Sequence, residues 1–222
     1  LVDGSWRAAL VVWSVPALLV AAAIGAVHLL GGVQRQHAGL PVTATPPWRL
    51  PRLWYLGVIL GAASAGYFGT NAYLATILQH QEQGERLAAY LFFFNGAQVI
   101  GSFSMIALAR FLIGKRKPIV VMAWCVAFSI AGIMAGSGWL TLASAFLLGL
   151  ATCIQLIQVV GLVPQIATSE RASSLSAGLF AIGYLLGFLV PLAGGLLVDS
   201  SGNAGLVLLP CLMLSLLGIV AA

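Results

Sequence analysis

Seven long apolar stretches, separated by short polar breaks, fill almost the whole of this chain. An α-helix needs about 20 apolar residues to cross the hydrocarbon core of a bilayer, and each stretch approaches or exceeds that length. The pattern predicts seven transmembrane helices, at residues 8–30, 53–79, 87–113, 118–136, 139–167, 173–198 and 205–221. The apolar runs are continuous and lack the alternation of membrane barrel strands, which favours helices.

The composition supports this interpretation. Of the 222 residues, 61% are hydrophobic and only 7% are charged. A soluble domain needs more polar surface than this chain carries. We therefore expect an all-α, polytopic membrane protein whose surroundings are the lipid bilayer. No nucleic-acid-binding module accompanies the net charge of +5, so nucleic acid is not an expected partner.

The positive charges are distributed unevenly between the two sides of this arrangement. Eight of the ten Lys and Arg residues lie in breaks that face one side, namely Arg35, Arg49, Arg52, Arg110, Lys115, Arg116, Lys117 and Arg171. The opposite side has only Arg7 and Arg86. The positive-inside rule assigns the basic side to the cytoplasm. We expect a multi-pass protein of the cell inner (plasma) membrane, with the N-terminus of this chain outside and its C-terminus in the cytoplasm.

One break is much longer than the others. Residues 31–52 contain four prolines and several polar residues, which is typical of a linker. The predicted organisation is one leading helix at 1–30, a central cytoplasmic linker at 31–52, and a six-helix bundle at 53–222. The remaining breaks are too short for a soluble catalytic domain. Because the chain lacks an initiator Met and stops inside an apolar stretch, we expect it to be a piece of a longer protein.

Small residues recur at four-residue steps in the sixth stretch, as Gly183, Gly187, Pro191 and Gly195. This spacing places them on one helix face, where another helix can approach closely. Tight static packing explains such a seam, and so does a contact that slides or bends during a conformational change, with Pro191 as the bend. The sequence leaves both explanations open.

Amide and phenol side chains mark the interiors of four stretches. They come as the pairs Tyr67 and Asn71, Asn95 and Gln98, and Gln155 and Gln158, with Tyr184 as a single phenol. Each pair is three or four residues apart and shares a helix face. Polar groups in hydrocarbon usually face a bundle interior or a wet cavity. We interpret the set as substrate-binding residues, and the alternative is hydrogen bonding from helix to helix.

Charged residues are confined to the ends of the stretches and the breaks between them. No buried carboxylate is available to relay a proton or to bind a cationic drug, which favours a small neutral or anionic solute. The sequence also has no spacing typical of a metal site, no phosphate-binding glycine loop and no nucleophile placed near a base. We therefore expect no cofactor, no metal and no enzymatic activity.

Three passages resemble the major facilitator superfamily of transporters, nearest its cyanate and nitroimidazole permease branch. Residues 173–202, SSLSAGLFAIGYLLGFLVPLAGGLLVDSSG, are similar to the eleventh helix of that family. Residues 67–78, YFGTNAYLATIL, resemble the seventh helix, although Ala75 replaces the usual proline. Residues 110–118, RFLIGKRKP, resemble the basic turn between the second and third helices of each half, without its frequent acidic residue.

The resemblance covers nearly the whole chain and implies a specific organisation. The chain would be the C-terminal half of such a transporter, preceded by the last helix of the N-terminal half. The predicted spans two, three, five and six would line a central cavity, and spans four and seven would pack outside it. Gly183, Gly187, Pro191 and Gly195, with the basic-turn residues Arg110, Lys115 and Arg116, would serve packing and conformational change. The N-terminal helical bundle of the same protein, a small-molecule substrate and a coupled proton or ion would be the partners.

Two hypotheses follow from these observations. The first is a secondary active transporter that moves a small polar or anionic solute across the membrane by alternating access. The second is a seven-helix receptor or sensor, since the number of spans and an external N-terminus also fit that class. The coding sequence upstream of Leu1 discriminates between them, because only the transporter requires five further spans.

Overall fold

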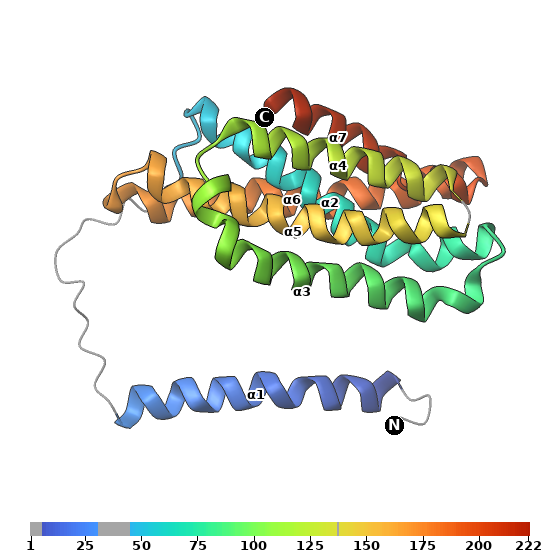
Figure 1. Cartoon of the computed structure of the whole chain (residues 1–222). Helices are drawn as coiled ribbons and strands as arrows, with labels where there is room; N and C mark the ends of the chain where they lie inside the picture. Colours follow the sequence, from blue (N-terminus) through green and yellow to red (C-terminus); the bar gives the residue numbers. More distant parts are fainter. Residues whose placement is uncertain (1–5, 31–44, 137) are drawn as a thin grey trace. The chain divides into compact units, whose positions relative to one another are not determined.

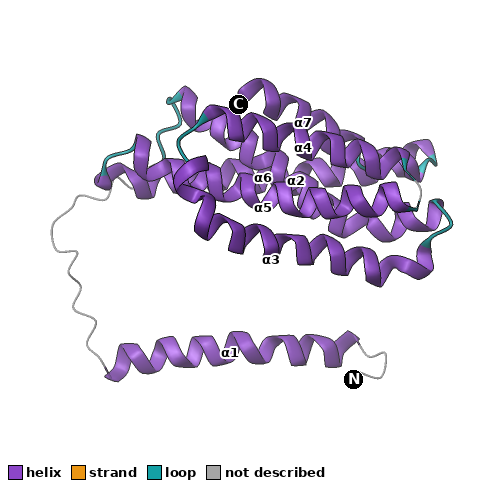
Figure 2. Cartoon of the chain, in the orientation of Figure 1, coloured by secondary structure: helices purple, strands orange, loops and turns teal. Residues whose placement is uncertain are grey.

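The computed structural model describes residues 6–136 apart from 31–44, and residues 138–222. All secondary structure in these residues is helical (Figures 1 and 2). The elements are α1 (Trp6–Leu30), α2 (Pro51–His80), η1 (Gly84–Arg86), α3 (Leu87–Leu112), α4 (Arg116–Ala135), α5 (Trp139–Ile166), α6 (Ser169–Ser201), η2 (Ala204–Leu206) and α7 (Leu209–Ala221). Within the described residues no strand occurs.

Six of the helical segments are long and apolar enough to cross a membrane. These segments cover α2 to α7, except for the first two residues of α6. They correspond to the last six predicted spans, with ends that differ by a few residues. The structure thus confirms the prediction of an all-α protein with several helices that are long and apolar enough to cross a membrane. The first predicted span forms α1, a helix of 25 residues that contains the apolar segment Ser14–Val27.

The chain divides into two compact units, residues 1–41 and 42–222. This division lies within the predicted linker, of which residues 31–44 are outside the described part. The first unit contains α1, with Pro16 inside the helix. The second unit contains the six-helix bundle, which carries every feature of the candidate site.

Helix α2 forms the centre of the bundle because its sequence is rich in small residues. Gly57, Gly61 and Gly66 are all buried, as is the run from Ile59 to Ala65 between them. Small residues in a membrane helix let neighbouring backbones approach closely. Helix α6 makes the most extensive contact with α2, and α7 and α5 also pack against α2.

Helix α5 organises the rest of the bundle by packing between α3 and α4. The apolar core has two clusters. The larger includes Phe94, Ile130 and Leu148, and the smaller includes Leu53, Ile119 and Val159. Together they fill much of the interior of the bundle with apolar side chains.

The turns between helices contain residues suited to ending a helix. Gly202 follows α6 in the left-handed conformation, with φ of 69°, and its N–H donates to the carbonyl of Val198 at 2.8 Å. Glycine adopts this conformation without steric strain, which makes it a common helix stop. Pro51 and Pro210 stand in the first turns of α2 and α7, where a missing N–H costs nothing.

Polar side chains connect two turns at the Arg86 end of the bundle. Gln81 Nε2 donates to the carbonyl of Ile133 at 2.8 Å, and the Thr141 hydroxyl donates to Gln81 Oε1 at 3.1 Å. The Tyr90 hydroxyl lies 2.6 Å from Gln83 Oε1 and 2.8 Å from the carbonyl oxygen of Gly138. These contacts hold the loop between α2 and α3 against the turn between α4 and α5.

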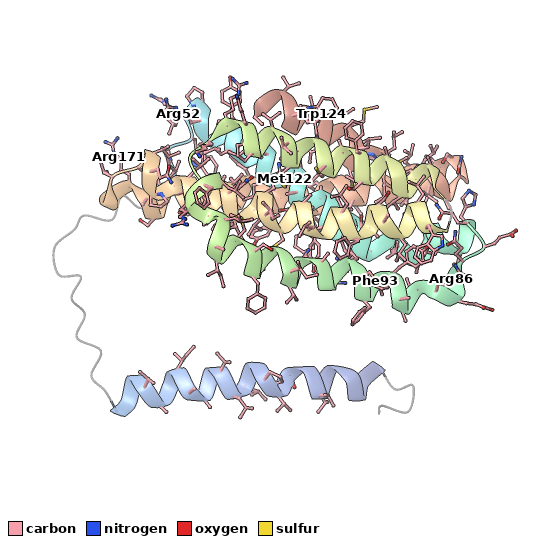
Figure 3. All side chains as sticks on the ribbon, in the orientation of Figure 1. Arg52, Arg86, Phe93, Met122, Trp124 and Arg171 are labelled. Carbon is pink, nitrogen blue, oxygen red and sulfur yellow. The ribbon has the colours of Figure 1, made fainter. Side chains whose placement is uncertain are left out.

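The charged side chains separate into two groups at the two ends of the bundle. Figure 3 shows Arg52 and Arg171 at one end and Arg86 at the other. The helix order places Arg49, Arg110, Lys115, Arg116 and Lys117 at the same end as Arg52. The predicted clustering is therefore present among the described side chains, which do not include Arg7 and Arg35. The assignment of this end to the cytoplasm stays a prediction.

Candidate functional site

A cavity of about 310 Å³ opens between four helices of the bundle. Helix α2 contributes four side chains, α5 contributes four, α3 two and α6 one. The lining consists of Ala63, Ser64, Tyr67, Phe68, Gln98, Ser102, Thr152, Cys153, Leu156, Ile157 and Tyr184. These are the four helices that the resemblance placed around a central cavity, whereas α4 and α7 contribute no lining residue to this opening.

Three of the predicted binding residues line this cavity directly. Tyr67 reaches it from α2, Gln98 from α3 and Tyr184 from α6. Each lies close to the middle of its helix. They provide two phenols and one amide, which can donate and accept hydrogen bonds without carrying a charge at neutral pH.

Two further predicted residues adjoin the cavity through a hydrogen-bond network between α2 and α3. The Tyr67 hydroxyl donates to Asn95 Oδ1 at 3.2 Å. Asn95 Nδ2 donates to the carbonyl of Leu91 at 3.0 Å and lies 3.5 Å from Asn71 Oδ1. Asn71 Nδ2 donates to the carbonyl of Tyr67 at 3.0 Å. The network fixes the orientation of the Tyr67 ring at the cavity wall.

Aromatic rings form a continuous row across the same region. Phe180 stacks on Tyr184 with ring centroids 5.6 Å apart, and Tyr184 lies 6.2 Å from Phe68. Phe68 contacts Tyr67 edge to face at 5.3 Å, and Tyr67 stacks on Phe94 at 5.5 Å. Such ring pairs add stabilisation beyond their buried area. The row joins α6, α2 and α3 and gives the cavity one rigid aromatic side.

The last predicted pair, Gln155 and Gln158, lies elsewhere. Both side chains are fully buried, and neither amide has a hydrogen-bond partner in the described residues. Helix α5 faces the cavity with Thr152, Cys153, Leu156 and Ile157, so the two glutamines belong to a different face of the helix. The structure therefore does not bring this pair together with the other predicted residues.

Several polar cavity residues were not selected from the sequence. Ser64 is almost completely buried, and its hydroxyl has no partner in the described residues. The Ser102 hydroxyl lies 3.2 Å from the Cys153 sulfur, which also contacts the carbonyl of Gln98 at 3.3 Å. Ser, Thr and Cys are common in membrane helices and give a weak signal by themselves. The usable signal was spacing, since Ser64 is three residues before Tyr67 and Ser102 is four after Gln98.

A second, apolar pocket of about 490 Å³ adjoins the cavity. It is formed by α2 and α6 and lined by Phe68, Ala72, Tyr73, Tyr184, Gly187, Phe188, Pro191 and Leu192. Phe68 and Tyr184 line both openings, so their ring contact forms the boundary between them. We call this second opening the aromatic pocket.

The predicted glycine seam of α6 lies against α2. A Cβ atom on Gly183 would stand 2.6 Å from Leu60, and one on Gly187 would stand 2.9 Å from the Cβ of Ser64. A Cβ on Gly195 would stand 2.6 Å from the Tyr73 hydroxyl. Pro191 lies inside α6 and lines the aromatic pocket. The seam is therefore a close helix contact beside both openings, and its movement stays a prediction.

The predicted basic turn between α3 and α4 is exposed. The Arg110 guanidinium lies 4.5 Å from the centre of the Phe111 ring, and Arg116 Nε donates to the carbonyl of Ala222 at 2.8 Å. Lys115 is exposed as well. Within the described residues no group of three or more His, Cys, Asp and Glu side chains is arranged to hold a metal ion.

Comparisons with protein-family models, with curated proteins and with solved structures find no match to this chain.

Proposed function

We propose that this chain is part of a secondary active transporter that moves a small polar or anionic solute across the membrane by alternating access. The proposal keeps the resemblance to the C-terminal half of a major facilitator transporter, and to its cyanate and nitroimidazole permease branch, as a hypothesis. The basic end of the bundle would face the cytoplasm, and the N-terminal bundle would complete the site from the opposite side.

The observation that carries the proposal is the position of this cavity, with its polar side chains, at the middle of the helices. Tyr67, Gln98 and Tyr184 lie near the centres of α2, α3 and α6, and Cys153 lies near the centre of α5. Transporter binding sites typically lie near the bilayer midplane, where several helices meet. Polar groups at this depth are expensive unless they serve a wet cavity or a functional contact.

The lining indicates the class of solute. Its polar groups are uncharged phenol, amide and hydroxyl groups, and neither an acidic nor a basic side chain contributes to it. Such groups hydrogen-bond neutral solutes and small anions, but they do not compensate a cation. A cavity of about 310 Å³ suits a molecule of few atoms. For an anion, the compensating cation would come from the N-terminal bundle.

The contact between α2 and α6 supplies a route for movement. Glycines on each helix receive side chains of the other. Gly57 and Gly61 of α2 face Ile182 and Leu186 of α6. Gly183 and Gly187 of α6 face Leu60 and Ser64 of α2. Packed helices can slide past one another by small amounts, and Pro191 offers a point of bending within α6. We assign the α2–α6 seam to the rocking movement that would expose the cavity alternately to each side.

The test uses the full-length protein in proteoliposomes. Uptake of labelled cyanate, formate, nitrate, urea and glycerol is measured against protein-free vesicles, and the solute with the highest uptake is then used with variants. Gln98→Ala and Tyr67→Phe should reduce its uptake at least fivefold. The matched control is Gln155→Ala, which removes an amide from another face of α5 and should keep most of the uptake.

Two outcomes would contradict the proposal. Uptake no higher than in protein-free vesicles for every solute would remove the transport function. Uptake that is unchanged in both Gln98→Ala and Tyr67→Phe would remove this cavity as the binding site.

A further inference from the structure

Several hydroxyl groups line the cavity of about 310 Å³, and three of them already use their protons in bonds inside the bundle. These three belong to Tyr67 on α2, Ser102 on α3 and Thr152 on α5. A hydroxyl group has one proton to donate and two lone pairs that accept. Where the proton is committed to another group, a solute that reaches the oxygen can only donate to it. The direction of each bond therefore limits the kind of solute that fits.

The direction of the Tyr67 bond is set by the amide of Asn95. Asn95 Nδ2 donates to the carbonyl of Leu91 at 3.0 Å, and it also lies 3.5 Å from Asn71 Oδ1. A backbone carbonyl only accepts, so a reversed Asn95 amide would place two acceptor oxygens 3.0 Å apart. Asn95 therefore directs Oδ1 toward Tyr67, whose hydroxyl donates to it at 3.2 Å. For a solute, only the lone pairs of the Tyr67 oxygen remain.

A second chain of bonds commits the proton of Ser102. The Cys153 sulfur lies 3.3 Å from the backbone carbonyl oxygen of Gln98, and the thiol is the donor because the carbonyl has no proton. A thiol has a single proton. The Ser102 hydroxyl, 3.2 Å from the same sulfur, is therefore the donor of that second contact. The chain from Ser102 ends at a backbone carbonyl of α3, as does the chain from Tyr67.

The proton of Thr152 is committed within its own helix. The Thr152 hydroxyl donates to the carbonyl of Leu148 at 2.8 Å and lies 3.2 Å from the carbonyl oxygen of Gly149. Threonine in a helix commonly makes this bond to the preceding turn. The Thr152 oxygen, like those of Tyr67 and Ser102, therefore offers lone pairs to the cavity and no proton.

The cavity thus combines three fixed acceptors, one from each of α2, α3 and α5, with groups that adapt to either kind of solute. The adaptable groups are the Gln98 amide and the hydroxyls of Tyr184 and Ser64, which contain both donors and acceptors. A solute with N–H or O–H groups can pair with the fixed acceptors and receive a proton from an adaptable group. An anion without protons would leave the fixed acceptors unpaired, which weakens its binding.

We infer that the solute of this cavity is a small neutral molecule with N–H or O–H donors, of the amide, urea or polyol class, rather than an anion without protons. The inference rests on the proposed transport function and narrows its solute. A cation is disfavoured because the lining has no acidic side chain. Asn95 and Cys153 act as positioning residues, since they hold the protons of Tyr67 and Ser102 away from the solute.

Urea, nitrate and guanidinium test the inference, because they share a planar, three-armed shape and differ in their protons and charge. Each is added at millimolar concentration and constant ionic strength to the full-length protein in detergent. The reaction of Cys153 with a small methanethiosulfonate reagent is then followed by peptide mass spectrometry, which reports binding without requiring transport. Urea should slow this reaction at concentrations about fivefold lower than nitrate, since unpaired acceptors weaken nitrate binding. Guanidinium should protect no better than nitrate.

Two variants should change the preference between urea and nitrate. Asn95→Leu removes the acceptor of the Tyr67 proton, so the freed hydroxyl can donate to a solute and the preference for urea should fall about fivefold. A merely structural effect would weaken both solutes alike. Ser102→Ala removes a fixed acceptor at an exposed position, and should weaken urea while leaving nitrate unchanged. The matched control is Asn203→Leu in the loop after α6, which should keep the wild-type preference.

The inference is overturned if nitrate or guanidinium protects Cys153 as well as urea does, or if urea gives no protection. An unchanged preference in both Asn95→Leu and Ser102→Ala overturns it as well. If the thiol does not react, the ratio of urea to nitrate uptake in proteoliposomes, corrected for protein-free vesicles, decides the question with the same variants.

The transport function is judged separately. Protection by urea without uptake of any solute would contradict transport and support the assignment of donors and acceptors. Uptake of nitrate in preference to urea would support transport and overturn the inference.

Discussion

The hydroxyl of Tyr67 donates a hydrogen bond to Asn95 Oδ1, at 3.2 Å, between the centres of α2 and α3. Tyr67 lines the polar cavity, and Asn95 is held by its own bond to the Leu91 carbonyl. This one bond therefore joins two helices and also orients a side chain in the cavity wall.

Removing this hydroxyl should affect stability and cavity function to different extents. In Tyr67→Phe the ring stays stacked on Phe94 while the hydrogen bond is lost, so we expect a loss of only about 0.6 kcal/mol in stability. Thermal unfolding of the full-length protein in detergent measures it. Tyr55→Phe, at an exposed tyrosine outside the cavity, is the control and should unfold as wild type does. A loss above about 2 kcal/mol would mean that Tyr67 is mainly a structural residue.

The buried amide of Gln155 should be replaceable by an apolar side chain with a gain in stability. Its Oε1 and Nε2 have no partner in the described residues, and an unpartnered buried amide costs about 1 to 3 kcal/mol. Gln155→Met retains most of the volume and removes that cost, so its unfolding temperature should rise. Gln98→Met, in the cavity wall, should change the unfolding temperature little. A fall in the unfolding temperature of Gln155→Met would show that this amide has a stabilising partner.

The α2–α6 seam should not tolerate a side chain at Gly187. A Cβ there would stand 2.9 Å from the Cβ of Ser64, and overpacking typically costs about 1 to 3 kcal/mol. Gly187→Val should therefore lower the unfolding temperature. The control is Gly96→Ala, because no atom lies within 4 Å of the added methyl group and helix propensity favours alanine by up to about 1 kcal/mol. Equal stability of the two variants would contradict the close packing.

The thiol of Cys153 should report access to the cavity. Cys153 lines the opening, whereas Cys211 is fully buried. A small water-soluble methanethiosulfonate reagent should modify Cys153 in the full-length protein and leave Cys211 unmodified, as read by peptide mass spectrometry. A transported solute should slow the reaction, and Cys153→Ser should abolish the loss of uptake that labelling causes. Labelling of Cys211 at the same rate as Cys153 would mean that the reagent reaches the thiols by another route.

The sequence predicted the helices better than it predicted the cavity. Continuous apolar runs and a bilayer of fixed thickness leave few choices for element type and length, so the six helices of the bundle begin and end near their expected positions. The presence of polar side chains inside apolar stretches also selected Tyr67, Gln98 and Tyr184. It could not separate them from Gln155 and Gln158, because a helix with neighbours on several sides can bury a polar residue away from the cavity.

The amino-acid pattern alone determined that this chain forms membrane-spanning helices with their positive charges gathered at one end, since hydrocarbon demands internally bonded backbones and excludes charge. Only the tertiary structure decided which polar side chains share an opening and which become buried. That choice depends on the rotation of each helix about its axis. The rotation is set by close contacts such as Gly187 with Ser64, which join residues far apart in the sequence.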